Sequence, residues 1–141
     1  MKKLIIFVGL LIAIFAAPSD ANPKEQASII SAYSAAWNAK DLAKMATLMH
    51  PDIEWLSVSG SKISVETKGK DELVSALEKW FLSPDLPKGS LRDWSINGNF
   101  VAVTETASWL DDANQQQSQS SLTVYELQDK LIRRVYYYPS I

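Results

Sequence analysis

The sequence contains no cysteine among its 141 residues, and it has only one histidine and three arginines. Without cysteine, the chain forms no disulfide, carries no cysteine for lipid attachment and offers no thiolate to a metal ion. The few arginines and the lack of a basic run argue against nucleic acid as a partner. The fold must therefore be held together by a hydrophobic core of ordinary size.

The single histidine and the placement of the acidic residues also limit the chemistry. His50 precedes Pro51 at the end of a predicted helix, where a cation suits the helix dipole, and we do not expect it to be catalytic. Asp111 and Asp112 are adjacent in a predicted turn, so their carboxylates point to different sides. We predict no metal site and no cofactor, and the sequence shows no Gly-rich phosphate loop or serine elbow.

The one long apolar run lies at the start of the chain. Residues 1 to 21 combine lysines at positions 2 and 3, an apolar run over residues 4 to 17, and the exit Ser19-Asp20-Ala21. This layout is typical of a secretory signal peptide and predicts an exported protein, periplasmic or secreted, with no stable membrane anchor after cleavage. The alternative is an uncleaved N-terminal anchor, for which the run is short.

The rest of the chain, residues 22 to 141, is long enough for one domain with one core and too short for two. It has 12 basic and 15 acidic residues, a net charge of −3. Helical patterns follow Asn22, Asp41 and Gly69. Strand patterns cover residues 53–58, 62–67, 91–96, 100–110, 120–127 and 131–138. The polar segment from Asn114 to Gln119 predicts a solvated hairpin loop. We predict an α+β fold with the three helices packed on the concave face of a curved antiparallel sheet.

The opening half of this domain carries a recognisable set of residues, supported by a short segment before the last predicted strand. The set comprises Tyr33, Trp37-Asn38-Ala39, Asp41-Leu42, Leu48, Pro51-Asp52, Glu54-Trp55 and Lys130-Leu131-Ile132. In these residues and in the order of its elements, the chain resembles the nuclear transport factor 2-like superfamily and, within it, the SnoaL-like branch. The resemblance implies a cone with a pocket between the concave sheet face and the first helix. It says little about chemistry, because relatives include isomerases, cyclases, dehydratases and binding domains.

Strand alternation predicts which side chains face the pocket. On residues 101–109, the odd positions, which include Glu105, form the more apolar face. On the last strand, the more aromatic face is the even one, and the resemblance also turns it inward. From both arguments we expect the ligand-binding residues to be Tyr33, Trp37, Trp55, Ser57, Trp80, Glu105, Trp109, Thr123, Arg134, Tyr136 and Tyr138.

Ketosteroid isomerase chemistry is a specific case that the resemblance allows us to test. It needs a carboxylate base and an oxyanion site made by a tyrosine and a protonated aspartic acid. Tyr33 matches the tyrosine, but the base position falls on Ser57 and the second donor falls near Thr123. Because serine does not abstract a carbon-bound proton unaided, we predict that this activity is absent.

Three functions stay open for the pocket. The leading interpretation is an exported domain that binds a small apolar or aromatic ligand. The first alternative is a lyase or isomerase in which Tyr33 donates a hydrogen bond and Glu105 acts as base. The second is a non-catalytic dimerisation or interaction module whose pocket is filled by its own side chains. An inward pair of Glu105 with Arg134 fits either a structural role or a polar ligand.

The outer face of the sheet predicts a homodimer. We expect it to carry Ala102, Thr104, Thr106 and Ser108 from one strand, and Leu131, Arg133, Val135 and Tyr137 from another. All three helices are needed on the concave side, so this partly apolar face has no cover within the chain. Relatives of the fold commonly pair two sheets back to back, which implies a two-fold dimer through this face.

The signal-peptide assignment gives the first prediction. Protein recovered from the exported fraction should begin at Asn22, because Ser19-x-Ala21 fits the preference of signal peptidase. N-terminal sequencing of that protein measures the cleavage point directly. A sequence beginning at Met1 in a membrane fraction would support the uncleaved anchor instead.

Overall fold

Two of the three helices begin at the predicted capping side chains, Asn22 and Asp41. The second helix ends at Leu48, so His50 and Pro51 lie in the following strand, and the predicted position of His50 at a helix end is wrong. In this computed structural model, which describes residues 22 to 141, α1 covers Pro23–Asn38, α2 covers Leu42–Leu48 and α3 covers Lys70–Phe81. The Asn22 side chain accepts a hydrogen bond from the Lys24 N–H at 3.0 Å, and Asp41 caps α2 in the same way. The predicted signal peptide, residues 1 to 21, lies outside the described residues.

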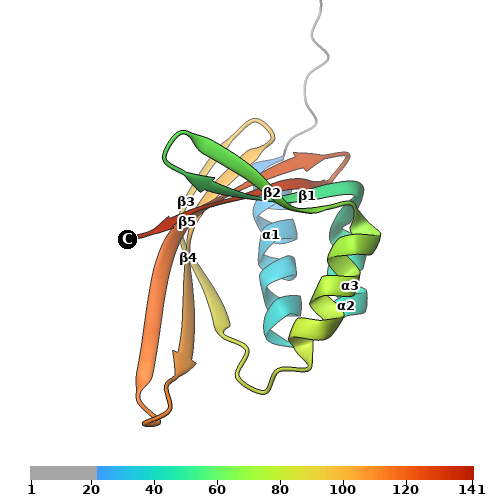
Figure 1. Ribbon diagram of the computed structural model, residues 1–141. Helices are drawn as coiled ribbons and strands as arrows, with labels where there is room; N and C mark the ends of the chain where they lie inside the picture. Colours follow the sequence, from blue (N-terminus) through green and yellow to red (C-terminus); the bar gives the residue numbers. More distant parts are fainter. Residues whose placement is uncertain (1–21) are drawn as a thin grey trace, which may run out of the picture.

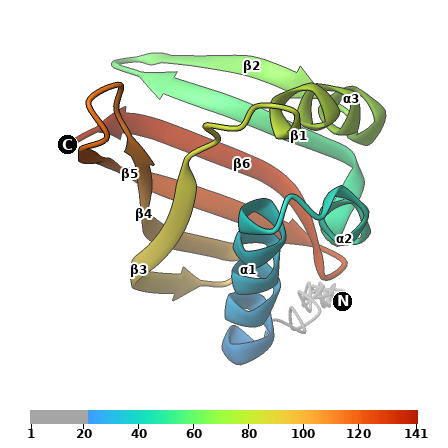
Figure 2. The same cartoon turned by 90° about the horizontal axis from the view of Figure 1, so that it is seen from below.

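Six strands form one curved sheet. They are β1 (Met49–Ser59), β2 (Lys62–Lys68), β3 (Lys88–Asn97), β4 (Phe100–Leu110), β5 (Gln116–Gln128) and β6 (Leu131–Ser140), in the order β2-β1-β6-β5-β4-β3. The pairs are antiparallel except β1 with β6, which is parallel. All three helices lie on one face of the sheet (Figure 1 and Figure 2), as the α+β prediction requires. No helix among the described residues is long and apolar enough to cross a membrane.

The glutamine-rich segment is a strand where the sequence predicted a loop. Gln116 pairs with Leu110, and the ladder between β4 and β5 continues from there without a shift to Phe100 and Glu126. The predicted hairpin loop from Asn114 to Gln119 is therefore wrong from Gln116 onward. Continuous pairing with a long neighbouring strand outweighs the weak strand preference of glutamine and serine.

One-residue bulges bend the sheet. The register shifts by one residue between β1 and β2, between β3 and β4, and at two places along β6. In β3 the shift comes where Asp93 has a positive φ of 55°. Bulges increase local twist and bend the strand that contains them, so they account for the cone shape of the sheet.

The bulge at Arg133 decides which side chains of β6 face inward. Ile132 pairs with Leu127 and Arg134 pairs with Glu126, which leaves Arg133 as the extra residue. Beyond it, Val135 is fully buried in the core. The predicted inward orientation of Arg134 and Tyr136 and the predicted outward orientation of Val135 and Tyr137 are therefore both wrong. Simple alternation fails here because an inserted residue changes the phase of the strand.

The core lies between α1, α2, α3 and the concave face. Its buried side chains come from every element except β2 and β3, and the fully buried ones include Ile30, Met45, Ile53, Leu73, Leu77, Val101, Val103, Ile132 and Val135. Val101 and Val103 confirm the predicted inward face of β4. Removing this apolar surface from water is the main favourable term that offsets the conformational entropy lost on folding.

The end of α1 is tied to the start of β3 by side-chain hydrogen bonds. The Asn38 Nδ2 donates to the Gly89 carbonyl at 2.8 Å, and the Gly89 N–H donates to Asn38 Oδ1 at 2.7 Å. The Trp37 indole N–H donates to the Pro87 carbonyl at 3.0 Å. The Asn38 side chain therefore bonds to both backbone groups of Gly89, as a neighbouring strand would, and holds the end of α1 against β3.

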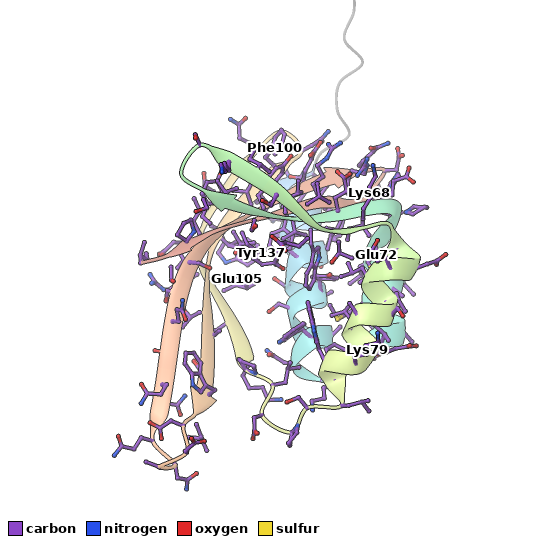
Figure 3. The ribbon with its side chains drawn as sticks, viewed as in Figure 1. Lys68, Glu72, Lys79, Phe100, Glu105 and Tyr137 are labelled. Carbon is purple, nitrogen blue, oxygen red and sulfur yellow. The ribbon has the colours of Figure 1, made fainter. Side chains whose placement is uncertain are left out.

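The opposite, convex face carries exposed apolar side chains. Directly paired strand residues share a face, so the register places Leu56, Val58, Ile63, Val65, Ala102, Leu122, Val124 and Tyr136 there. Phe100 lies on this side, away from the helices (Figure 3). Ile63 is 61% exposed and Leu122 is 41% exposed, and no described element covers them.

The Asn38–Gly89 contact gives the second prediction. Asn38→Ala should lower the free energy of unfolding by about 1–3 kcal/mol, because both Gly89 backbone groups lose their partner in a half-buried site. Urea unfolding measures the loss. Asn38→Asp places a carboxylate oxygen against the Gly89 carbonyl oxygen, so it should not restore the lost stability. Equal stability of Asn38→Ala and the wild type would contradict the assigned role.

Candidate functional site

A cavity of about 540 Å³ lies between α1 and the concave face of the sheet. The face is supplied by β1, β3, β4, β5 and β6, and the segment before β3 closes one side. The lining residues are Tyr33, Ser34, Trp37, Trp55, Pro87, Gly89, Leu91, Glu105, Thr106, Ala107, Gln119, Ser121, Tyr125, Tyr137, Tyr138, Pro139 and Ser140. Six of them are aromatic and one, Glu105, is acidic.

The aromatic walls are held by packing against one another and against the core. Tyr33 meets Tyr125 edge to face, with ring centroids 6.4 Å apart, and Trp55 meets Tyr137 edge to face at 5.5 Å. Trp37 packs in the same way on Phe81 at 5.5 Å. Edge-to-face pairs are favourable beyond the area they bury, so these rings are positioned before any ligand arrives.

Glu105 is the one carboxyl group of the cavity, and it projects from β4. It points toward the space beside α1, as does Tyr137 from β6 (Figure 3). The Tyr125 hydroxyl donates a hydrogen bond to the Glu105 carboxylate. Burial raises the pKa of Glu105 above its ordinary value, and the Tyr125 hydroxyl and the Thr123 side chain oppose that rise. Desolvation outweighs these two interactions, and no cationic side chain among residues 22 to 141 lines the cavity to favour the charged form.

Two buried polar atoms in the cavity wall lie next to each other and make no hydrogen bond of ordinary geometry. They are the Tyr33 hydroxyl oxygen and the Trp55 indole nitrogen. Burial raises the pKa of Tyr33, the neighbouring Trp55 side chain opposes the rise and the charge of Glu105 adds to it. Tyr33 is therefore a neutral hydroxyl at every ordinary pH. Buried polar groups without partners are uncommon in folded proteins, and they are found where a water or a ligand completes the site.

Five of the eleven predicted ligand-binding residues line the cavity. They are Tyr33, Trp37, Trp55, Glu105 and Tyr138, and they include Tyr33 and Glu105, the two candidates for catalysis in the enzyme alternative. The other six lie outside the lining: Ser57, Trp80, Trp109, Thr123, Arg134 and Tyr136. Thr123 is fully buried beside Glu105, and Trp80 is 43% exposed and packs on the outer side of Trp55.

Arg134 and Tyr136 are outside because of the bulge in β6. Arg134 binds Glu54 at 3.0 Å and Glu126 at 2.9 Å on the convex face. The predicted pair between Glu105 and Arg134 is therefore wrong. Arg134 instead lowers the pKa of Glu54, chiefly through their hydrogen bond. Ser57 pairs with Ser64 on the edge strand β2 and donates a hydrogen bond to the Glu66 carboxylate.

Sequence reasoning missed Tyr125 and Tyr137 as cavity residues. Tyr125 pairs with Val101 on β4 and with Val135 on β6, so it shares their inward face. The alternation of β5 was a usable signal, since Thr123, Tyr125 and Leu127 are the buried positions of that strand. Tyr137 had no such signal, because its orientation follows from the bulge.

The acidic and histidine side chains do not gather elsewhere. Within residues 22 to 141, no group of three or more such side chains is placed to hold a metal ion. The Asp111 carboxylate accepts hydrogen bonds from the Ala113 and Gln115 N–H groups and from the Gln117 side chain, which lowers its pKa. It closes the hairpin between β4 and β5, which is a structural role.

Solved structures share this architecture at low sequence identity. An NTF2-like protein from Cytophaga hutchinsonii has a TM-score of 0.60 and 15% identity, over 81% of this chain and 97% of that one. A protein with a ketosteroid isomerase-like fold from Catenulispora acidiphila, in complex with trimethylamine, has a TM-score of 0.64 and 13% identity, over 80% and 85%. TerC, co-crystallised with polyporic acid, has a TM-score of 0.64 and 17% identity, over 80% and 89%.

These similarities show the fold. A comparison with the curated proteins gave no match. The SnoaL-like domain family matches residues 30 to 135, from the first turns of α1 to the middle of β6. The match covers most of the chain and agrees with the cone of three helices and a curved sheet, so the chain belongs to the SnoaL-like domain family of the nuclear transport factor 2-like superfamily.

Proposed function

We propose that the protein binds a small molecule with an apolar or aromatic body in the cavity between α1 and the sheet, and that it does so after export. A volume of about 540 Å³ lies within the ordinary range of small-molecule pockets. Six aromatic side chains give the walls, and a few polar groups are placed among them, which is the usual composition of such a site.

The observation that carries the proposal is the half-buried carboxyl of Glu105 at an open cavity, which has a hydrogen bond from Tyr125 and no cationic partner among the residues that line the cavity. Placing a carboxyl group there disfavours its charged form and costs stability that an apolar residue would not cost. Such local costs are found at sites of function more than elsewhere. Two other protein structures of this fold hold small molecules, trimethylamine in one and polyporic acid in the other.

A second candidate function is proton transfer by the same residues. A carboxyl group with a raised pKa is a stronger base once ionised, and the neutral Tyr33 hydroxyl can donate a hydrogen bond to a developing oxyanion. This alternative is the lyase or isomerase considered from the sequence. A filled interaction module is disfavoured, because Trp37, Trp55 and Tyr138 line the cavity and leave it open.

The homodimer is also a proposal, now with a corrected contact surface. Val135 and Tyr137 face inward, so the contact would use the exposed apolar residues of the convex face, chiefly Ile63, Val65 and Leu122. The mixed charges of Arg134, Glu54 and Glu126 lie beside them. A two-fold axis through this face would bring the apolar residues of each copy together and leave charges of both signs at the rim.

The dimer proposal predicts a clear response to one substitution. Leu122→Glu should give monomers with a normal fold, because it places like charges across the two-fold axis. Leu82→Glu is the matched control, since Leu82 is 84% exposed at the end of α3, on the helical side of the sheet. Sedimentation at micromolar concentration decides between the outcomes. A monomeric wild type there would remove the proposal.

The binding proposal predicts that filling the cavity abolishes binding. Ala107 lines the cavity, and its neighbour Ser108 lies outside the lining on the same strand. Ala107→Phe should lose a small molecule that co-purifies with the wild type, whereas Ser108→Phe should retain it. Native mass spectrometry of protein purified from its own compartment makes the comparison. A wild type without any bound molecule, which also fails to bind a neutral hydrophobic dye, would contradict the proposal.

A further inference from the structure

The cavity has one group that can carry a full charge near neutral pH, and that charge is negative. The groups that face Glu105 are Tyr33 from α1, Tyr125 from β5 and Tyr137 from β6, with Leu91 opposite on β3. Burial raises the pKa of all three tyrosines, so they stay neutral. Among the described residues, no lysine, arginine or histidine lines the cavity.

The arginines of the chain are engaged elsewhere. Arg134 binds Glu54 and Glu126 on the convex face, Arg133 donates to the Asp52 carbonyl, and Arg92 pairs with Asp93. The lysine nearest in sequence to the lining, Lys88, donates to the Asn38 carbonyl on the outside of the α1 corner. Among residues 22 to 141, no cationic side chain lines the cavity, so none neutralises Glu105 there.

This charge distribution selects among ligand classes. An anionic ligand would meet a carboxyl group and no cation. No attractive charge would then offset the free energy lost when the ligand leaves water. A neutral ligand would leave the cost of burying Glu105 in place. A cationic ligand would supply the missing countercharge within the low-dielectric site, where attraction between opposite charges is strongest.

The aromatic walls favour the same class. Tyr33, Trp37, Trp55, Tyr125, Tyr137 and Tyr138 surround the space beside Glu105. Tryptophan and tyrosine rings attract cations through their negative faces, and the effect is larger where the cation has lost its water. Ammonium ions with hydrocarbon substituents are bound in proteins by this combination of rings and a carboxylate.

We propose that the ligand of this cavity is an organic ammonium ion, with its positive nitrogen beside the Glu105 carboxylate and its hydrocarbon groups against the aromatic walls. The inference rests on the proposed binding function and names its ligand class. Glu105 then serves as the countercharge of the ligand. The cavity recognises the charge and the apolar body of the ligand together.

The pH dependence follows from the same contact. In the free protein, burial raises the pKa of Glu105 above its ordinary value and so disfavours the carboxylate form. A bound cation favours the carboxylate and lowers that pKa, and binding therefore releases a proton. Affinity for the cation should rise as the pH rises through the pKa of the free protein and become constant above it.

The test uses three probes of similar size that differ in charge. They are benzyltrimethylammonium, its neutral isostere neopentylbenzene and the anion phenylacetate. Tryptophan fluorescence reports binding, because Trp37 and Trp55 line the cavity. We expect the cation to bind roughly 10-fold more tightly than the isostere, from cation–π and ionic attraction in a partly desolvated site. Phenylacetate should bind most weakly.

The variant that tests the contact is Glu105→Gln, which keeps an acceptor for the Tyr125 hydroxyl. It should weaken binding of the cation by about 10-fold or more and leave neopentylbenzene nearly unchanged. Glu78→Gln is the matched control, since Glu78 is exposed on α3 and outside the cavity lining. Calorimetry of the wild type in buffers of different ionisation enthalpy measures proton release without any variant.

The outcomes separate the inference from the function on which it rests. Equal binding of the cation and its isostere, or an unchanged cation affinity in Glu105→Gln, would overturn the ammonium assignment and leave small-molecule binding in place. Binding of none of the three probes by a wild type that also carries no co-purified molecule would overturn both. Tighter cation binding that depends on Glu105 and releases a proton would support the inference.

Discussion

The extra residue in β6 is the constraint on which both faces of the sheet depend. With Arg133 inserted between Ile132 and Arg134, the chain returns Val135 to the core and turns Tyr137 into the cavity. In a strand of strict alternation, Val135 would stand in water and Arg134 would enter an apolar space. The bulge therefore keeps the Arg134 charge out of the core, and it also adds Tyr137 to the aromatic wall of the cavity.

The same bulge explains the electrostatics of the cavity. By placing Arg134 on the convex face, it gives Glu54 and Glu126 a shared cation and leaves Glu105 with none. A pair of Glu105 with Arg134 would have offset much of the cost of burying the carboxyl group. In this geometry no arginine offsets the desolvation of Glu105, and the hydrogen bond from the Tyr125 hydroxyl offsets it only in part. A positively charged ligand would therefore supply the countercharge that the cavity lining does not give to Glu105.

Sequence reasoning succeeded where the signal is local and regular. The caps at Asn22 and Asp41 fixed the starts of two helices, and plain alternation placed Glu105 inward. It failed where the cause is non-local. The bulge in β6 is set by pairing with β5 and β1, and Gln116 becomes a strand residue only because Leu110 lies opposite. The family resemblance gave the fold, and it could not correct the phase of a single strand.

The tryptophan-bounded corner from Trp37 to Trp55 explains why the cavity stays open. Trp37 is tied to the Pro87 carbonyl and Asn38 to both backbone groups of Gly89, so α1 cannot settle closer to β3. At the other end of the corner, the Trp55 ring packs against both Trp80 and Tyr137. Rings held in this way cannot rotate inward to fill the space without breaking hydrogen bonds or edge-to-face contacts. The corner is therefore packing and pocket wall at once, and its packing is what preserves room for a ligand.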